Sequence, residues 1–223
     1  MDVRFMGSVA SATVLAVALA ACATTTPQSG ASFFVTSKGG GKGADFGGLE
    51  GADKHCQALA AAAGLGDRTW RAYLSTQAAG STPAVNAKDR IGTGPWRNTK
   101  GAVIATGVGE LHADNNLTKQ TALTEKGAVV NGRGDTPNQH DVLTGTQPNG
   151  TAFPPGDDKT CGNWTKSGSE GSAIVGHIDR TGLPTSPIAE ATSWNSSHAS
   201  KGCSDAGLVS TGGAGLLYCF AAK

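Results

Sequence analysis

Charged side chains are scarce in this chain, and cationic ones do not cluster. Charged residues make up 16% of the 223 residues, and the formal net charge is +1. Neither a basic run nor a basic surplus is present to neutralise a series of phosphates. Nucleic acid is therefore not an expected partner.

Recognisable catalytic patterns are also missing. The chain has no Gly-x-Ser-x-Gly sequence, which would place a nucleophilic serine on a tight turn. No two histidines have the i, i+4 spacing with which one helix presents two zinc ligands. The five are His55, His112, His140, His177 and His198, and an Asp lies close to three of them in the sequence: His112, His140 and His177. An enzyme is therefore the least expected class of function.

The N-terminus is typical of an exported protein. Arg4 precedes the apolar stretch at residues 9–20, which is too short to span a membrane as a mature helix. The stretch ends in Leu19-Ala20-Ala21-Cys22, which resembles the lipobox of bacterial lipoproteins. We expect residues 1–21 to be a signal peptide, Cys22 to carry the lipid and residues 22–32 to be a flexible tether. The alternative is a plain secretory signal that leaves Cys22 free.

This N-terminus also predicts where the protein lies. A lipid on Cys22 would anchor it in the bacterial cell envelope, with the lipid as its only contact with the membrane. Ala23 and Thr24 stand where an acidic signal for retention at the inner membrane could be. Their presence favours the outer membrane or the cell surface.

The other four cysteines predict two disulfides, because an even number in an exported domain is normally paired. Spacing alone leaves three pairings open. Cys56 lies on the apolar stripe of a predicted helix at residues 51–63, and Cys219 lies in an apolar run at residues 215–220. Because both would point into the core, we favour the nested pairs Cys56–Cys219 and Cys161–Cys203.

Regular structure is predicted mainly at the two ends of the domain. Apolar or alternating runs predict strands at residues 33–37, 69–75, 171–178 and 215–220. Most of residues 76–162 consists of turn-forming residues with short apolar islands. One helix among several strands indicates an α+β fold with long loops.

Several of these segments resemble the endostatin domain at the C-termini of collagens XV and XVIII. The matching positions follow one another in the same order: Gly48-Leu49-Glu50-Gly51-Ala52-Asp53, Cys56, Ala63-Gly64-Leu65, Arg71-Ala72-Tyr73-Leu74-Ser75, Asn86-Ala87-Lys88-Asp89, Trp96, Asp141-Val142-Leu143, Pro148-Asn149-Gly150, Cys161, Trp164, Cys203 and Leu217-Tyr218-Cys219. The chain is also similar to bacterial exported proteins of unknown function that share the opening motif. The resemblance implies one C-type lectin-like domain at residues 33–223. It would have a mixed antiparallel sheet, one or two helices and nested disulfides.

Two short segments resemble the calcium and sugar site of C-type lectins. Gln147-Pro148-Asn149 resembles the Glu-Pro-Asn ligand tripeptide, and Trp194-Asn195 resembles the start of a Trp-Asn-Asp motif. Ser196 replaces the last Asp of that motif, so other acids would have to complete a calcium site. The candidates for that role are Asp157, Asp158 and Glu170. The alternative is that Pro148-Asn149-Gly150 is an ordinary turn.

Other residue patterns have plainer explanations. Arg133-Gly134-Asp135 spells an integrin-binding tripeptide, which readily arises by chance in a chain with 33 glycines. Trp70 and Trp164 are expected in the core rather than on a sugar ring. The zinc site of endostatins uses N-terminal histidines that this chain lacks.

Taken together, these patterns predict a lipid-anchored envelope module that binds a glycan or another surface protein. Calcium is the one cofactor that they suggest. The alternative is a structural envelope protein that takes no small ligand.

Overall fold

The computed structural model of this chain describes residues 1–3 and 30–222. Cys22 and most of the predicted signal peptide and tether lie outside these residues. Ala31 and Ser32, at the end of the predicted tether, are buried against the domain. Ser32 Oγ donates a hydrogen bond to the Pro95 carbonyl at 3.3 Å. None of the helices in the described part of the chain is long and apolar enough to cross a membrane.

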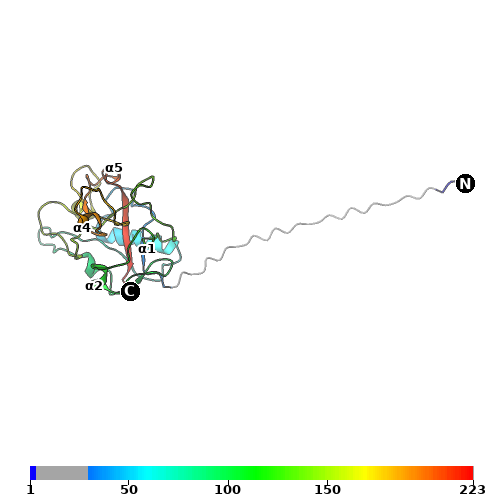
Figure 1. The fold of residues 1–223 in the computed structure, drawn as a ribbon, viewed down its shortest axis with the longest axis horizontal. Coiled ribbons are helices and arrows are strands. Elements are labelled where there is room, and N and C mark those ends of the chain that lie inside the picture. Colours follow the sequence, from blue (N-terminus) through cyan, green and yellow to red (C-terminus); the bar gives the residue numbers. More distant parts are fainter. Residues whose placement is uncertain (4–29, 223) are drawn as a thin grey trace.

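The fold is built around one long strand, β8 (Gly213–Ala221), which runs through the centre of the domain in Figure 1. Its C-terminal half pairs antiparallel with β1 (Phe33–Val35) and β2 (Trp70–Ala72). Its N-terminal half pairs in parallel with β5 (Asp141–Leu143). The sheet is therefore mixed, and this confirms the predicted α+β class.

The sheet continues from β5 to a short edge. β6 (Ile174–His177) pairs antiparallel with β5, and the two-residue strand β7 (His198–Ala199) pairs antiparallel with β6. A separate two-stranded sheet joins β3 (Trp96–Arg97) to β4 (Val103–Ala105). A two-residue edge strand offers little exposed backbone for pairing with another chain.

Both faces of β8 are covered by apolar side chains. Leu217 and Cys219 point to one core cluster, with α1 (Gly48–Ala62) on that side. Leu216, Tyr218 and Phe220 point to a second cluster on the opposite face. A strand covered on both faces is apolar at successive positions instead of alternating, which explains the run Leu216–Phe220.

α1 follows the predicted stripe, since Ala52, Cys56, Leu59 and Ala60 are its buried residues. It begins three residues before the predicted start at Gly51. Just after its end, Gly64 has a φ of +76°, the left-handed conformation that commonly ends helices.

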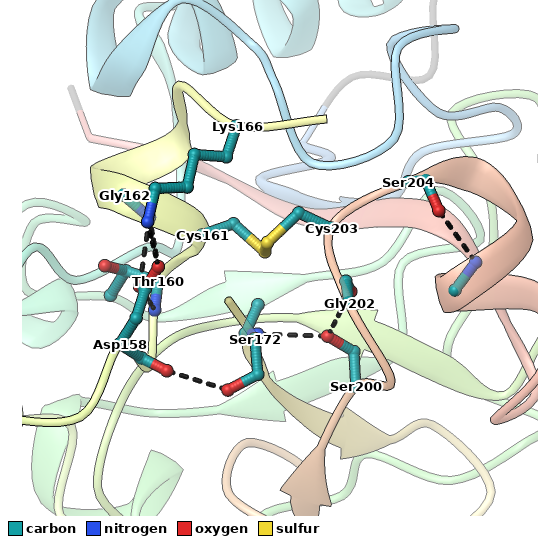
Figure 2. Close-up of a disulfide and its surroundings, with 12 residues drawn as sticks. Asp158, Thr160, Cys161, Gly162, Lys166, Ser172, Ser200, Gly202, Cys203 and Ser204 are labelled. Carbon is teal, nitrogen blue, oxygen red and sulfur yellow. Dashed lines mark hydrogen bonds and ion pairs between the residues drawn. A yellow bond between two sulfur atoms is a disulfide. The ribbon is translucent and has the colours of Figure 1, made fainter. Parts of the chain in front are cut away.

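The two disulfides are Cys56–Cys219 and Cys161–Cys203, which confirms the nested pairing. The outer bridge ties α1 to β8. The inner bridge ties a helical turn at Cys161 to the loop at Cys203 (Figure 2). Asp158 supports this turn by accepting hydrogen bonds from the backbone N–H groups of Thr160 and Gly162.

Several short elements were not predicted from the sequence. Three of them are α-helices of four or five residues: α2 (Val108–Leu111), α4 (Ile188–Ala191) and α5 (Asp205–Val209). The fourth, α3 (Cys161–Trp164), is a single turn whose residues have left-handed backbone, with φ from +49° to +69°. A 3₁₀ turn, η1, spans Ala87–Asp89. The expectation of one or two helices therefore holds only for long helices, because α1 alone exceeds five residues among those described.

Candidate metal centre

Three neighbouring strands bring three histidines and one aspartate together. His140 directly precedes β5, Asp141 begins β5, His177 ends β6 and His198 begins β7. The register places Asp141 opposite His177, and His198 opposite Val175. Because residues two apart in a strand share a face, His177 and Val175 point the same way, and His198 joins them from the edge.

The Nε2 atoms of the three histidines surround one carboxylate oxygen. Asp141 Oδ1 lies 3.2 Å from His140 Nε2, 3.4 Å from His177 Nε2 and 3.6 Å from His198 Nε2. The rings of His140 and His177 stack at 4.3 Å, and the ring of His198 meets that of His177 edge-on at 5.0 Å. We call these four residues the His/Asp cluster.

The other nitrogen of each ring faces an acceptor outside the cluster. His140 Nδ1 lies 3.2 Å from Asp179 Oδ1, His177 Nδ1 lies 3.0 Å from the Ala191 carbonyl, and His198 Nδ1 lies 3.1 Å from the Ala199 carbonyl. Because these acceptors have no proton to give, each Nδ1 acts as the donor. In a neutral imidazole the Nε2 lone pair is then free and points toward Asp141.

Asp179 holds the His140 ring in this orientation. Burial by itself raises the pKa of Asp179, but hydrogen bonds from His140 and from the Arg133 backbone N–H lower it well below its usual value. Asp179 is therefore ionised and accepts the His140 Nδ1 proton. A carboxylate behind a histidine is a common arrangement at metal sites, where it orients the ring and raises its basicity.

The centre of the cluster lacks hydrogen-bond donors. Among the described residues, neither oxygen of Asp141 nor Nε2 of His177 has a hydrogen-bond partner. Asp141 and His177 are only 2% and 3% exposed. Unpaired polar atoms at this depth cost about 1–3 kcal/mol each, and more when charged. Their proximity therefore requires a cation between them, which is either a proton or a metal ion.

The charges of the cluster respond to one another. Burial favours the neutral form of Asp141, and protons carried by the imidazoles of His177 and His198 would outweigh this effect and lower the pKa of Asp141. The Asp141 carboxylate in turn raises the pKa of His198 above its ordinary value, against the effect of burial. A carboxylate this deeply buried stays charged only if a neighbouring positive charge or hydrogen-bond donor stabilises it.

The three separations from Asp141 Oδ1 fit the edges of a tetrahedral site; His140, Asp141 and His177 form the tighter group, and His198 meets it through Asp141 Oδ1. Bonds of about 2.0–2.1 Å from zinc to nitrogen and oxygen imply edges of about 3.3 Å between neighbouring ligands. The three edges from Asp141 Oδ1 are 3.2, 3.4 and 3.6 Å. The candidate ligand atoms of His140, Asp141 and His177 also lie within 4.8 Å of one another. Three imidazoles and one carboxylate suit zinc and neighbouring transition metals better than calcium.

A pocket of about 440 Å³ opens onto the cluster. His140, His177 and His198 all line it, whereas the side chain of Asp141 is fully buried beneath them. The His198 side chain is 39% exposed and forms part of the pocket wall. The pocket therefore meets the cluster on the face made by the three imidazoles.

Gly212 allows the backbone to pass close to His140. Its φ is +106°, and a Cβ at this position would lie 3.1 Å from His140 Nε2 and 2.6 Å from the Asn138 side chain. The Gly212 carbonyl accepts the backbone N–H of Asp141 at 3.1 Å. A larger residue there would push against a candidate ligand.

The residues predicted for a calcium and sugar site serve other purposes. Asn149 Oδ1 accepts two hydrogen bonds from Thr151, and Gln147 Nε2 donates to Thr151 and to the Ala152 carbonyl. Asn195 does reach this turn, but it does so by donating its amide N–H to the carbonyls of Gln147 and Pro148. Calcium needs oxygen ligands, so donors directed at this point do not fit it.

The remaining members of that predicted site do not complete it. Trp194 is buried and packs against Tyr73 at 4.8 Å, so it offers no ring face at the surface. Asp158 accepts hydrogen bonds from backbone N–H groups and from Lys166, and Asp157 is 92% exposed beside Lys159. Glu170 is exposed. These side chains do not fit a calcium ion.

The two tryptophans predicted for the core and the Arg-Gly-Asp tripeptide lie among the described residues. Trp70 and Trp164 are buried, as expected. In the Arg-Gly-Asp tripeptide, Asp135 pairs with Lys119, while the Arg133 side chain lines the pocket.

Sequence reasoning missed the His/Asp cluster because its ligands do not share one helix. The Nδ1 of His198 faces the Ala199 carbonyl, while its Nε2 faces Asp141. A usable signal was present in the strands. Asp141 directly precedes the apolar run Val142-Leu143, and His177 follows Ile174-Val175 after a single glycine, Gly176.

Comparison of the chain with protein-family models gives no match, and comparison with curated proteins gives none.

Proposed function

We propose that this domain is a binding module of the bacterial cell envelope, centred on a divalent transition metal held by the His/Asp cluster. The observation that carries the proposal is the ring of three Nε2 atoms around Asp141 Oδ1, with no donor between them. A metal ion would be bound directly by His140, Asp141, His177 and His198. It would replace the missing donors and neutralise the buried carboxylate.

The proposed envelope location, fold family and partner of this module are supported by the sequence. The lipobox-like segment supports lipidation at Cys22, and the order of motifs supports a C-type lectin-like domain with a glycan or a surface protein as partner. Palmitate labelling of the wild type and of Cys22→Ser tests the anchor, and an unlabelled wild type would overturn it.

Calorimetric titration of the chelated, dialysed protein with zinc tests the metal centre. Wild type is expected to bind one zinc ion. His177→Gln is expected to weaken zinc binding more than about 100-fold, because losing a direct ligand should cost more affinity than losing a residue that supports a ligand, which typically costs about 10–100-fold. His55→Gln is the matched control, because His55 bonds to the Lys38 carbonyl outside the cluster.

The alternative to a metal ion is a proton shared within the His/Asp cluster. In that case the titration of wild type with zinc gives no heat of binding, and zinc does not raise the melting temperature of wild type. The domain would then be better explained as a structural envelope protein without a small ligand.

A further inference from the structure

The pocket above the cluster has a composition that selects a class of ligand. Its lining includes the cationic residues Arg133 and Lys201 and the hydroxyl-bearing residues Ser186, Ser210 and Thr211, together with the apolar residues Leu183 and Ala199. No acidic residue lines it among those described. From these features we infer that the metal-loaded pocket binds a small hydroxylated carboxylate, of the kind that an acidic sugar presents. This inference rests on the proposed metal centre.

Charge favours an anion. A divalent ion would be balanced by the carboxylates of Asp141 and Asp179, which contact His140 and do not line the pocket. Arg133 and Lys201 are exposed, and no ion pair within the described residues involves either of them. The loaded pocket therefore carries an uncompensated positive charge at its rim, which attracts anions and speeds their association.

A further ligand can reach a metal ion in the cluster from the pocket. Asp141 lies beneath the three imidazoles, and these imidazoles form the face that the pocket reaches. A carboxylate entering from the pocket would add an oxygen ligand to a zinc ion held by the cluster, an expansion that zinc tolerates. A carboxylate is an acceptor only, so it suits a metal ion and a cationic rim together.

The hydroxyls of the wall explain why the ligand should carry hydroxyl groups of its own. Ser210 Oγ donates its proton to the Gly207 carbonyl at 2.8 Å, and Thr211 Oγ1 donates to the Leu208 carbonyl at 3.1 Å. Their remaining lone pairs can only accept. A ligand that satisfies them must bring donors, which sugar hydroxyls supply and a simple carboxylate such as acetate does not. The volume of about 440 Å³ lies within the range of small-molecule sites.

Cobalt-loaded full-length protein tests this inference, because the visible absorption of cobalt changes when a fifth ligand binds. Glucuronate is expected to change the spectrum at lower concentration than acetate, and glucose is expected to leave it unchanged. In the double variant R133Q/K201Q cobalt should still bind, but glucuronate should bind roughly tenfold more weakly, as expected for two partly solvated charge contacts.

Control variants and ligands separate the outcomes. Lys100→Gln removes an exposed lysine outside the pocket and should leave glucuronate binding unchanged. Ser210→Ala should weaken glucuronate but not acetate. If cobalt binds and glucuronate leaves the spectrum unchanged, or if an acidic dipeptide binds as tightly as glucuronate, this inference is overturned while the metal centre stands. If cobalt does not bind, both fail.

Discussion

The imidazole rings of His140 and His177 stack with their centroids 4.3 Å apart and their planes 12° apart. This stack ties the residue before β5 to the last residue of β6 and places both Nε2 atoms beside Asp141. Because an imidazole binds a metal ion in the plane of its ring, one ion bound by both Nε2 atoms is expected to tilt these nearly parallel rings toward each other.

Replacing Asp141 by Asn should have opposite effects on the metal-loaded and metal-free protein. With zinc, the variant loses a ligand and should bind more than about 100-fold more weakly. Without metal, the variant no longer buries an unpaired carboxylate, so its free energy of unfolding should equal or exceed that of wild type. Urea unfolding with EDTA and with zinc measures both. A variant less stable than wild type in EDTA would show that Asp141 is satisfied without a metal.

Asp179→Asn should weaken zinc binding by about 10–100-fold while leaving the four ligands in place, because Asp179 acts through the His140 ring. Asp135→Asn is the matched control, since Asp135 pairs with Lys119 and accepts the Gly132 N–H without touching a histidine. Zinc calorimetry on both variants is the measurement. Equal affinities in the two would show that Asp179 does not support the site.

The two disulfides should differ in their effect on the cluster. Replacing Cys161 and Cys203 by Ala opens a loop of 42 residues, which contributes up to about 4 kcal/mol in the chain-entropy model. His198 lies five residues before Cys203, so zinc affinity should fall as well. Replacing Cys56 and Cys219 by Ala removes the bridge that closes a loop of 163 residues, so the free energy of unfolding should fall further. The zinc affinity of the folded fraction should stay unchanged. Loss of zinc binding in the second variant alone would contradict this.

His112 should make the protein less stable in acid. Burial lowers the pKa of His112, and Lys88 lowers it further, against the hydrogen bond to the Val108 carbonyl that raises it. The folded state therefore holds this proton less well than the unfolded chain, whose histidines titrate near pH 6.5, so stability falls as the pH drops below about 6.5. In EDTA, His112→Gln should show a smaller loss of unfolding free energy between pH 7.5 and 5.5 than wild type. The wild-type loss in His112→Gln would contradict this prediction.

The sequence predicted those parts of the fold whose pattern is local. α1 shows its apolar stripe in one continuous segment, and β8 shows an apolar run because both of its faces are covered. The disulfides followed, since each of these elements carries one inward cysteine. Residues 76–162 could not be predicted in this way, because side chains distant in sequence hold them. Gln77, for example, donates to the carbonyls of Pro154 and Asp157 and accepts the Lys159 N–H.

The candidate site depended on information that the sequence does not display. Asp141 meets His177 only through the register of β5 and β6, and His198 joins them only through β7. The polar atoms of the predicted sugar motif show the same dependence on the fold. Asn195 lies beside the Gln147 turn, but its amide donates to backbone carbonyls and to the Tyr73 hydroxyl. A motif of three residues does not specify which way its polar atoms point.

The central position of β8 has a consequence for how the chain reaches its native state. β8 pairs Phe220 with Phe33 and Leu143 with Leu217, so the middle of the sheet cannot form until segments far apart in sequence meet. Chains dominated by such distant pairings fold slowly, typically in milliseconds to seconds. Until β8 is in place, the apolar residues of β1, β2 and β5 have no partner strand at the centre of the sheet. During that interval the unpaired strands are the surfaces most exposed to aggregation and most in need of a chaperone.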